Sequence, residues 1–283
     1  MRSRTPLALA ATAAVVALVG CAGGGAGDDG DQTMTFWHNS TTGDGRAYWD
    51  DMVAAFEEEN PGITIEVESI QNEDMDGRLQ TAVNSGSMPD IFMARGGGKL
   101  ADIVAAGAVR DLSDLIDDDV AADYGDGVFS AFTVDDAIYG MPVAVLPGGI
   151  FYSQDLFAAA GVDATPTSID ELDAAVSALD ATGVEPIALG AQDAWPAAHW
   201  YYFFALRECS QEVMETIATS LDFSDECWLA AGEDLAAFAE TEPFNDGYLT
   251  TTAQQGAGSS AGLVANGIAA MELMGGWNVG VIG

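Results

Sequence analysis

Apolar and polar residues repeat with two different periods over the first seventy residues that follow Gln32. Strict alternation at 63–68 is typical of a strand with one buried face, whereas apolar side chains from Tyr48 to Phe56 recur at helical spacing until Asn60-Pro61-Gly62. The predicted elements are strands at 34–37, 63–68 and 89–94, and helices at 48–59, around 79–83 and at 99–106. Strands that alternate with helices predict a mainly parallel sheet with right-handed crossovers and helices on its faces.

The second half of the chain predicts another α/β unit. An acidic, weakly patterned segment at 111–126 indicates a surface passage, and we expect the chain to cross between two lobes at Leu146-Pro147-Gly148. Ser168 and Glu171 form a capping box that opens a helix. That helix buries Leu172, Ala175, Val176 and Leu179. Further predicted elements are extended segments at 138–145 and 149–152, a strand at 186–191, helices at 195–207, 212–219 and 224–240, and a strand at 268–274 that returns toward the first lobe.

The first residues resemble a bacterial lipoprotein export signal. Arg2 and Arg4 precede an apolar run at 7–19, which is too short to span a ~30 Å hydrocarbon core as a helix. The run closes with Leu18-Val19-Gly20-Cys21, so Cys21 is expected to be acylated. The alternative is a plain secretory signal. Either predicts an extracytoplasmic protein, and the lipid would anchor it to the outer face of the cell membrane.

The predicted organisation has five parts. They are a signal peptide at 1–21, a flexible tether rich in Gly, Ala and Asp at 22–32, a mainly N-terminal lobe with crossover at 33–145, a mainly C-terminal lobe at 146–265, and a return segment at 266–283. No apolar run after the signal is long enough to span a membrane, so the lipid is the expected membrane attachment.

The charge is strongly acidic. Eight Lys and Arg against 45 Asp and Glu give a net charge of −37, which becomes −39 once Arg2 and Arg4 are removed with the signal. Such a field repels polyanions, so nucleic acid is excluded as a partner, and a neutral or cationic ligand is favoured. A solvated acidic surface that keeps the protein soluble explains most of this charge without any ligand.

Two cysteines remain once Cys21 is assigned to lipid. Cys209 and Cys227 are 18 residues apart, and an oxidising compartment favours a disulfide worth about 3 kcal/mol. The alternative is two separate buried thiols. A metal site is not expected, because His199 is the one further Cys or His near them. No cofactor is expected either.

Polar side chains follow each of the first three predicted strands, where the loops of an open α/β sheet hold ligands. The loops contain amides and hydroxyls, one cation and a few acids, which suits a neutral polyhydroxylated ligand. The candidates are His38, Asn39 and Ser40 after the first strand, Gln71 and Asn72 after the second, and Arg95 after the third. Ordinary loop polarity and helix capping are the alternative for each residue alone.

Two tryptophans are candidates for stacking on the C–H faces of a sugar. Trp195 and Trp277 lie at the ends of predicted elements beside Pro or Gly, in segments that also contain His199 and Asn278. Trp49 and Trp228 lie on helical stripes and are expected in the core. Within the dense aromatic run Trp200, Tyr201, Tyr202 and Phe204, most side chains are expected in the core and one against ligand.

Several motifs, in order, resemble the extracellular solute-binding proteins of family 1, the maltose-binding-protein-like group. They are Phe36-Trp37-His38-Asn39, Asn60-Pro61-Gly62, Leu79 to Ala82 through Pro89 to Phe92, Tyr139 to Pro142, Phe151 to Phe157, and Ala270-Met271 through Gly276-Trp277. The resemblance implies a two-lobed, type II periplasmic-binding-protein-like fold that closes by a hinge on a mono- or oligosaccharide. It also implies a monomer that delivers sugar to ABC transporter permease subunits. Carried over by position, Gln192 and Asp193 join Trp195 as contacts from the second lobe.

This sequence departs from the family pattern in two places. Leu146 stands where the maltose binder has an acid, so maltodextrin specificity is not carried over, and binders of α-1,6-linked sugars such as raffinose or isomaltosides are the more similar members. Family members also continue beyond their Gly-x-Trp segment, whereas this sequence ends at Gly283. We therefore expect a C-terminally incomplete fold.

Other functions remain as alternatives. The binding protein could take a polyamine or a peptide, and two of the 45 acids could serve a glycosidase. Gly258-Ser259-Ser260-Ala261-Gly262 fits the G-x-S-x-G pattern, but the polar stretch before it lacks strand character, and His38 and His199 both precede Ser260. Gly96-Gly97-Gly98-Lys99 lacks the spacing of a phosphate loop. We therefore expect a binding protein rather than an enzyme.

Overall fold

The computed structural model describes residues 31–282. The expected export signal, the lipidated Cys21 and most of the expected tether lie outside the described residues. Gln32, expected at the end of the tether, already begins the first strand, because it pairs with Ile63 of the neighbouring strand.

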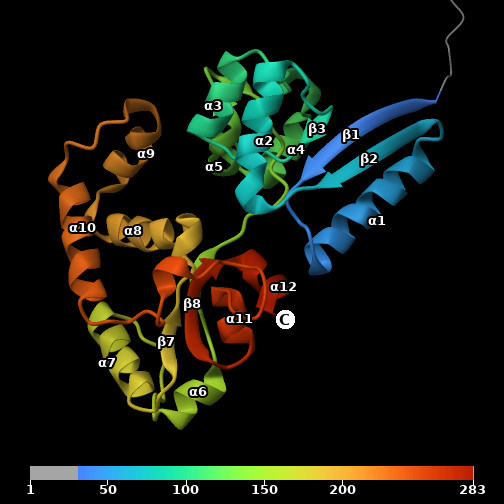
Figure 1. Cartoon of the computed structure of the whole chain (residues 1–283). Helices are drawn as coiled ribbons and strands as arrows, with labels where there is room; N and C mark the ends of the chain where they lie inside the picture. The colour runs from blue at the N-terminus through green and yellow to red at the C-terminus, as the bar shows by residue number, and fades with distance from the viewer. Residues whose placement is uncertain (1–30, 283) are drawn as a thin grey trace, which may run out of the picture.

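The first lobe is built on a parallel sheet in the order β2-β1-β3 (Figure 1). Its strands are β1 (Gln32–His38), β2 (Ile63–Ser69) and β3 (Ile91–Phe92), and its helices are α1 (Gly43–Glu59), α2 (Asn72–Ser85) and α3 (Gly98–Ala105). The predicted succession of strands and helices is confirmed. β3 is shorter than predicted, because the Asp90 carboxylate accepts hydrogen bonds from the backbone N–H (2.8 Å) and hydroxyl (2.9 Å) of Thr35, where a longer strand would pair.

Helix α1 covers its sheet only lightly. Trp49 is half-buried and packs edge-on against Phe36, with ring centroids 5.1 Å apart. Within the predicted apolar stripe, Val53 is also half-buried, but Tyr48, Met52 and Phe56 are exposed, and α1 has no fully buried residue. Helix α2 instead supplies the core of this lobe through Met75 and Leu79.

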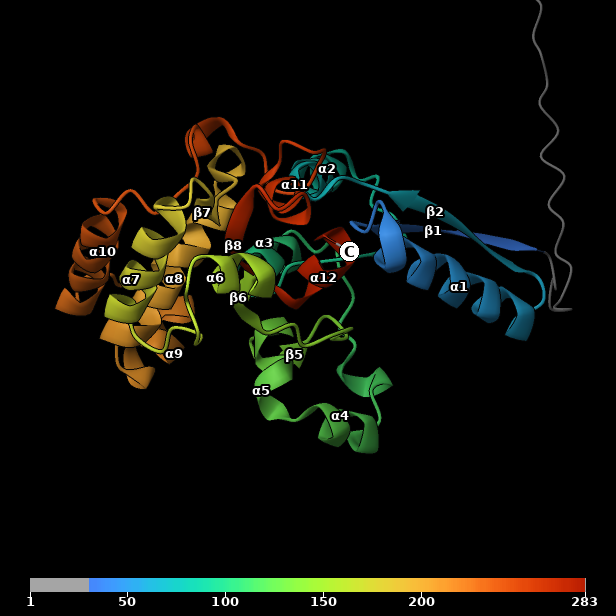
Figure 2. The same ribbon diagram turned by 90° about the horizontal axis from the view of Figure 1, so that it is seen from below.

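The segment between the lobes contains short elements. They are η1 (Ser113–Leu115), α4 (Asp118–Tyr124), α5 (Asp126–Phe129), η2 (Ser130–Phe132), β4 (Thr133–Val134) and β5 (Ala137–Ile138), which Figure 2 shows as a group apart from both sheets. β4 and β5 form a hairpin whose two turn residues, Asp135 and Asp136, both have positive φ, as a type I′ turn requires. The extended run predicted at 138–145 pairs only through its first residue, in β5.

The second lobe has a mixed sheet in the order β6-β8-β7, in which β8 is antiparallel to β6 and parallel to β7. Its elements are β6 (Gly148–Tyr152), α6 (Gln154–Ala159), α7 (Ile169–Asp180), β7 (Glu185–Ala188), η3 (Ala191–Asp193), α8 (Trp195–Glu208), α9 (Gln211–Ser220), α10 (Glu226–Ala239), η4 (Tyr248–Thr250), α11 (Ser260–Ala265) and β8 (Ala269–Gly275). The strand predicted at 268–274 is therefore the centre of this sheet.

The return to the first lobe begins only after β8. Elements η5 (Gly276–Asn278) and α12 (Val279–Ile282) follow it, and α12 lies against α1. The approach is close, because a side chain at Gly43 would place its Cβ 2.9 Å from the carbonyl oxygen of Gly280. The chain thus crosses between the lobes before β6 and again after β8 (Figure 1).

The core of the second lobe agrees with the predicted helix pattern. Helix α7 buries the four residues predicted from its spacing, and Ser168 caps it by accepting a hydrogen bond from the Glu171 backbone N–H (3.2 Å). The Glu171 carboxylate bonds to the backbone and hydroxyl of Thr167, one residue earlier than a standard capping box. Trp228 is buried as expected, and Cys209 and Cys227 are bonded between the end of α8 and the start of α10. No helix in 31–282 has the length and apolar character needed to cross a membrane.

Candidate functional site

The loops at the carboxyl ends of β1 and β2 are joined by hydrogen bonds between their polar side chains. The Asn39 side-chain amide donates to Asn72 Oδ1 (3.1 Å), and the Thr41 hydroxyl donates to Gln71 Oε1 (3.4 Å). Arg95, which follows β3, donates from its guanidinium to Asn72 Oδ1 (2.7 Å) and to the Asn72 carbonyl oxygen (3.2 Å). The parallel sheet thus brings the three predicted polar loops to one edge.

The two cations near these loops, Arg95 and Lys99, are paired with the same carboxylate. Arg95 Nε lies 3.0 Å from Asp76 Oδ1, and Lys99 Nζ bonds to Asp76 Oδ2. Partial burial raises the pKa of Asp76, but the bonds and charges of Lys99 and Arg95 lower it by more, so the carboxylate stays ionised. A single carboxylate therefore holds both cations.

In the second lobe, a close approach of two backbone segments builds the opposite side of the site. A Cβ on Gly190 would lie 2.5 Å from Ala253 Cα, so only glycine fits where η3 meets the 251–255 segment. Asp193 holds the same segment, because its Oδ2 accepts a hydrogen bond from the Ala253 backbone N–H (2.7 Å). Asp193, a predicted ligand residue, is thus already engaged, whereas the Gln192 side chain is exposed.

Four rings gather at the start of α8 and on η5, and we call them the aromatic floor. They are Trp195, His199 and Tyr202 of α8 and Trp277 of η5. The Trp195 and Trp277 ring centroids are 6.3 Å apart, and that of His199 is 5.3 Å from Trp195 and 6.1 Å from Trp277. Burial lowers the pKa of His199, so its imidazole is neutral at neutral pH. The floor is apolar, aromatic and uncharged.

Local backbone geometry places both indoles. Ala194 has φ 61°, which turns the chain sharply just before Trp195 begins α8, and Pro196 lies in the first helical turn. Trp277 folds back over Gly275, where a Cβ would lie 1.9 Å from the indole Cζ3 atom. Trp277 keeps 37% of its surface exposed, and Trp195 is half-buried.

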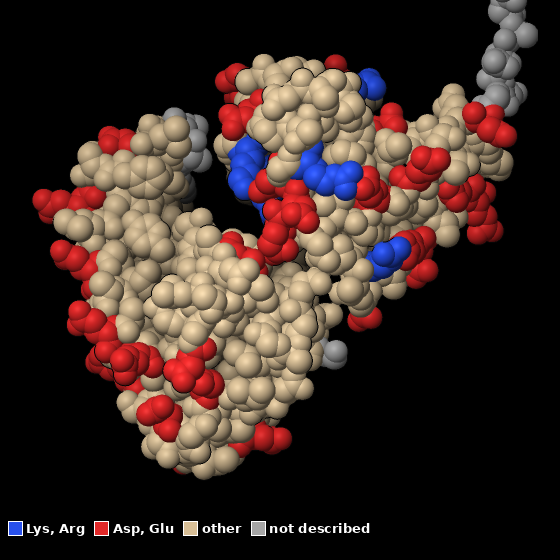
Figure 3. Space-filling view, viewed as in Figure 1, with Lys and Arg blue, Asp and Glu red and all other residues tan. Residues whose placement is uncertain are grey.

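The two lobes touch through the polar loops and the floor. The Trp195 indole N–H donates to Glu73 Oε1 (3.2 Å), and the Gln255 side-chain amide donates to Gln71 Oε1 (2.7 Å). Figure 3 shows the surface hollowed between the two masses, with acidic and basic atoms together on the side of the first lobe that faces the second. Each of these two contacts joins one predicted site residue, Trp195 or Gln71, to a residue of the other lobe that was not predicted.

Two predicted site residues lie in the interior instead. His38 and Asn278 each have 0% of their surface exposed. His38 Nδ1 accepts a hydrogen bond from the Ser40 backbone N–H (3.2 Å), and the Asn278 amide donates to Glu272 Oε2 (2.7 Å). Both side chains support the loops that carry the site rather than face the cleft. Ser40, which His38 holds, is half-buried at the cleft edge of β1.

Glu73 and Gln255 are the cleft residues that the sequence did not single out. Glu73 is one of the acids noted after the second strand, but a loop pattern cannot show which acid faces the other lobe. Gln255 lies in the polar stretch before α11, where the sequence has no local signal of function.

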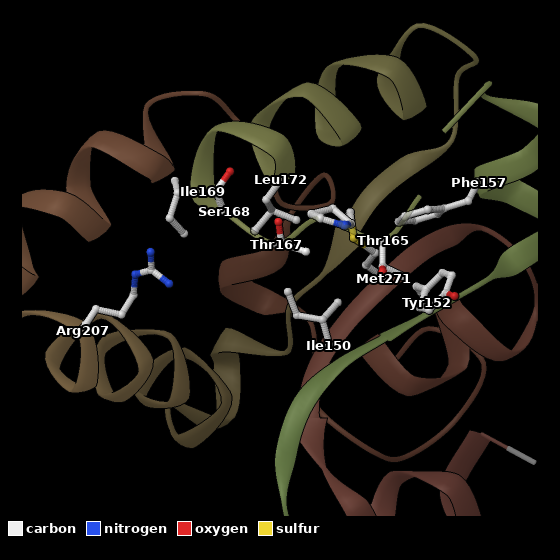
Figure 4. Close-up of a pocket in the computed structure, with 11 residues that line it drawn as sticks. Ile150, Tyr152, Phe157, Thr165, Thr167, Ser168, Ile169, Leu172, Arg207 and Met271 are labelled. Atoms are coloured by element: carbon white, nitrogen blue, oxygen red, sulfur yellow. The ribbon is translucent and has the colours of Figure 1, made fainter. Parts of the chain in front are cut away.

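A separate cavity of about 360 Å³ lies in the second lobe, on the side of β6 and α7 (Figure 4). Apolar side chains such as Ile150, Phe157 and Met271 line it, and Arg207 lies at its edge. It shares no residue with the aromatic floor or the polar loops, so we do not assign the predicted site to it.

The serine hydrolase alternative does not fit the structure. Ser260 is fully buried, its hydroxyl donates to the Ala253 carbonyl oxygen (2.9 Å), and it begins α11 after a loop instead of after a strand. A nucleophile elbow needs an exposed hydroxyl between a strand and a helix. Across residues 31–282, no three His, Cys, Asp or Glu side chains gather in the way a metal site needs.

Two α/β lobes with polar loops facing an aromatic floor define a two-lobed ligand-binding protein. The family model for bacterial extracellular solute-binding proteins matches residues 39–283, and the chain belongs to that family.

Curated relatives agree with the family. A binding protein of Brucella abortus is 29% identical over 61% of this chain and 42% of its own length. An ABC transporter extracellular-binding protein of Pyrococcus horikoshii is 24% identical over 87% of this chain and 56% of its own length, and the alpha-glucosides-binding periplasmic protein AglE of Rhizobium meliloti is 26% identical over 76% and 49%. The chain spans about half the length of the curated relatives it matches.

Solved structures are also similar. One, from work on xylan utilization by Caldanaerobius polysaccharolyticus, has a TM-score of 0.78 and 26% identity, and covers 87% of this chain and 62% of that chain. A chitin oligosaccharide binding protein has a TM-score of 0.76 and 26% identity, over 88% and 62%. The predicted two-lobed fold and the predicted family are thus confirmed.

Proposed function

We propose that this chain is the substrate-binding component of an ABC-type sugar importer, which captures a mono- or oligosaccharide and delivers it to permease subunits. The observation that best supports this proposal is the contact between the lobes, where the Trp195 indole, with Trp277 beside it, bonds to Glu73 next to the amides of Gln71 and Asn72. The proposal concerns the activity of the whole protein. The matched part of this chain spans about half the length of the curated relatives.

The chemistry of the two sides matches the two kinds of surface on a sugar. Ring C–H groups are apolar and pack on indole faces, whereas hydroxyls donate to and accept from amides such as Gln71, Asn72 and Gln192. The loop amides bond to polar side chains such as Arg95, Thr41 and Gln255, and a sugar hydroxyl can replace such a partner, because it both donates and accepts hydrogen bonds.

The names of similar proteins point to the same class of ligand. AglE is named for alpha-glucosides, one solved structure for chitin oligosaccharides and another for xylan utilization. Solute-binding proteins in complex with raffinose (20% identity) and stachyose (21%) share the fold. We take carbohydrate as the class of ligand and leave the linkage, including the α-1,6 expectation, to a screen.

The proposed mechanism is hinge closure. Ligand contacts divide between the lobes, so only the closed state satisfies all of them, and ligand shifts the population toward closure. Micromolar affinity corresponds to roughly 8 kcal/mol, which two stacked indoles and several hydrogen bonds can supply. The proposal includes an extracytoplasmic monomer held at the outer face of the cell membrane through Cys21, with transport and no catalysis as its role.

The test is a calorimetric screen of neutral mono- and oligosaccharides against the chain and its Trp195→Ala and Trp277→Ala variants. Each variant is expected to weaken binding at least about tenfold, since an indole platform contributes more than ~1.4 kcal/mol. Tyr48→Ala is the control, because Tyr48 is an exposed aromatic residue on α1. Unchanged affinity in both tryptophan variants would remove the stacking proposal, and release of sugar products would indicate an enzyme.

A further inference from the structure

Glu73 lies where the two lobes touch, beside the Trp195 indole on which a sugar is proposed to stack. It lies in the first turn of α2, and its Oε1 accepts the hydrogen bond from the Trp195 indole N–H across the cleft. The neighbouring Asn72 amide also donates to this oxygen, at 3.3 Å. The side chain is exposed, and within residues 31–282 its Oε2 has no hydrogen-bond partner.

This bond leaves both the ring and the carboxylate able to bind a ligand. An indole has one donor, and Glu73 engages that donor at the ring edge, so this bond itself covers neither face of the ring. A carboxylate accepts at about four lone-pair positions, so Oε2 can take hydrogen bonds from hydroxyls of a sugar that lies on Trp195. Glu73 therefore positions the indole with one oxygen and presents an acceptor with the other.

The charges around the polar loops do not favour an anionic sugar. Arg95 and Lys99 are both bonded to Asp76, and Glu73 and Asp74 add two further carboxylates beside them, so acids outnumber cations in this group. On the floor, burial keeps the His199 imidazole neutral by lowering its pKa. A carboxylate or phosphate on the sugar would meet the Glu73 carboxylate across a few ångströms, with Asp74 beside it in the same helical turn.

We propose that Glu73 is the specificity-determining residue of the cleft: it orients the Trp195 indole and restricts the position on that indole to sugar units that donate hydrogen bonds and have no negative charge. Neutral sugars and amino sugars meet this condition, whereas uronic acids and phosphorylated or sulfated sugars do not. The inference rests on the proposed function, because it assumes that a sugar lies on Trp195.

Matched pairs of probes test the inference by isothermal calorimetry. The pairs are galactose and galacturonate, glucose and glucuronate, and raffinose and its derivative oxidised to a carboxylate at C6 of the galactose unit. The wild-type chain is expected to bind the neutral member of a pair at least about thirtyfold more tightly, because unpaired like charges in a cleft cost several kcal/mol. Glu73→Gln keeps a carbonyl oxygen for the indole and is expected to narrow that ratio about tenfold.

Asp74→Asn is the matched control, because it removes the same charge one residue away, and within residues 31–282 the Asp74 side chain makes no hydrogen bond to the second lobe. It is expected to leave most of the discrimination in place. Glu73→Ala, which also removes the acceptor, is expected to change the tryptophan fluorescence and to weaken neutral sugars too, since it frees the indole.

The outcomes separate this inference from the proposed function. If the wild-type chain binds a neutral sugar and its uronate equally tightly, the role of Glu73 is overturned but the sugar-binding function stands. The same holds if Glu73→Gln leaves the ratio of the two affinities unchanged. An equal loss of discrimination in Asp74→Asn assigns it to the general acidic field and also overturns the inference. If none of the neutral sugars in the panel or in the wider screen binds, that result counts against the proposed function itself.

Discussion

Glu272 is a carboxyl group buried behind the aromatic floor. It lies in the middle of β8 with 1% of its surface exposed, and its Oε2 accepts a hydrogen bond from the Asn278 side-chain amide (2.7 Å). Within the described residues, Glu272 Oε1 and Asn278 Oδ1 have no hydrogen-bond partner. Burial raises the pKa of Glu272, against the opposite effect of Ser260 and Asn278. Burial of an oxygen without a partner favours the protonated form, so we expect Glu272 to keep its proton to a higher pH in the folded protein than in the unfolded chain.

Glu272→Gln is expected to stabilise the fold at neutral and alkaline pH. Below about pH 4.5 the carboxyl is protonated in both states and the two proteins should be similarly stable. As pH rises above that value, the unfolded chain releases the proton of Glu272 while the folded chain still holds it. The free energy of unfolding of the wild-type protein therefore falls until the pH passes the raised pKa of the folded state. Glutamine does not titrate, and its amide can pair with Asn278. The expected gain at pH 8 is about 1–2 kcal/mol in urea unfolding.

Glu240→Gln, at an exposed helix end, is the control for removing a charge from an acidic protein. A gain of the same size in both variants would assign the effect to net charge. A Glu272→Gln protein that is less stable than wild type at pH 8 would contradict a raised pKa of Glu272 in the folded protein.

Strand β1 shows how far the direction of single side chains could be predicted from the sequence. Phe36 and His38 lie two apart on β1 and are both buried, because side chains two apart share one face of a strand. His38 was predicted in the loop after the strand, but it is the last residue of β1, and the alternation along that strand turns its ring inward. Asn278 is similar, since it follows Trp277 in a tight turn whose side-chain directions the sequence does not specify.

At the scale of elements, η5 presents Trp277 to the cleft only because Gly275 lacks a side chain. Gly275→Ala would place Cβ 1.9 Å from the indole, so the ring must move. We expect sugar affinity to fall at least about tenfold, as for loss of the indole, with a stability cost of about 1–3 kcal/mol. Calorimetry and urea unfolding measure the two effects.

Gly276→Ala is the matched control for Gly275→Ala. A Cβ at Gly276 would lie no closer than 3.6 Å to Leu146 and Pro147, which is an ordinary contact. Normal affinity in Gly275→Ala would mean that the observed pose of Trp277 is not the one that binds sugar.

Long periodic segments were the elements that the sequence predicted best. Helices α1, α7, α8 and α10 were expected from 3.6-residue spacing, since that signal accumulates over several turns. The short helices α4, α5, α6 and α11 were not predicted, because one or two turns contain too little pattern. Strand pairing is a long-range property, so β5 and β3 proved shorter than their apolar runs.

At the scale of the whole molecule, the sequence predicted which loops gather but not how the lobes meet. Polar residues after β1, β2 and β3 share an edge because parallel strands end together. The contacts of Trp195 with Glu73 and of Gln71 with Gln255 join residues 122 and 184 positions apart. Their existence depends on the angle between the lobes, for which no local pattern provides a signal.

Those two hydrogen bonds should bias the lobes toward each other before any ligand arrives. Gln255→Ala removes one of them, and a net hydrogen bond of about 0.5–1.5 kcal/mol corresponds to a roughly two- to tenfold shift toward the open state. Small-angle X-ray scattering of the ligand-free protein should show a larger radius of gyration. Sugar affinity should fall by up to the same factor, because ligand must first restore the closed population.

Gln254→Ala provides the comparison for this change, since it removes an equal side chain one residue away that, among the residues the structure describes, makes no hydrogen bond to the first lobe. At saturating sugar, wild type and Gln255→Ala should scatter identically, because ligand contacts then hold the closed state in both. Unchanged scattering and affinity in Gln255→Ala would show that the 2.7 Å contact forms without influencing closure. The angle between the lobes would then depend on the packing of α12 against α1 and on the two chain crossings.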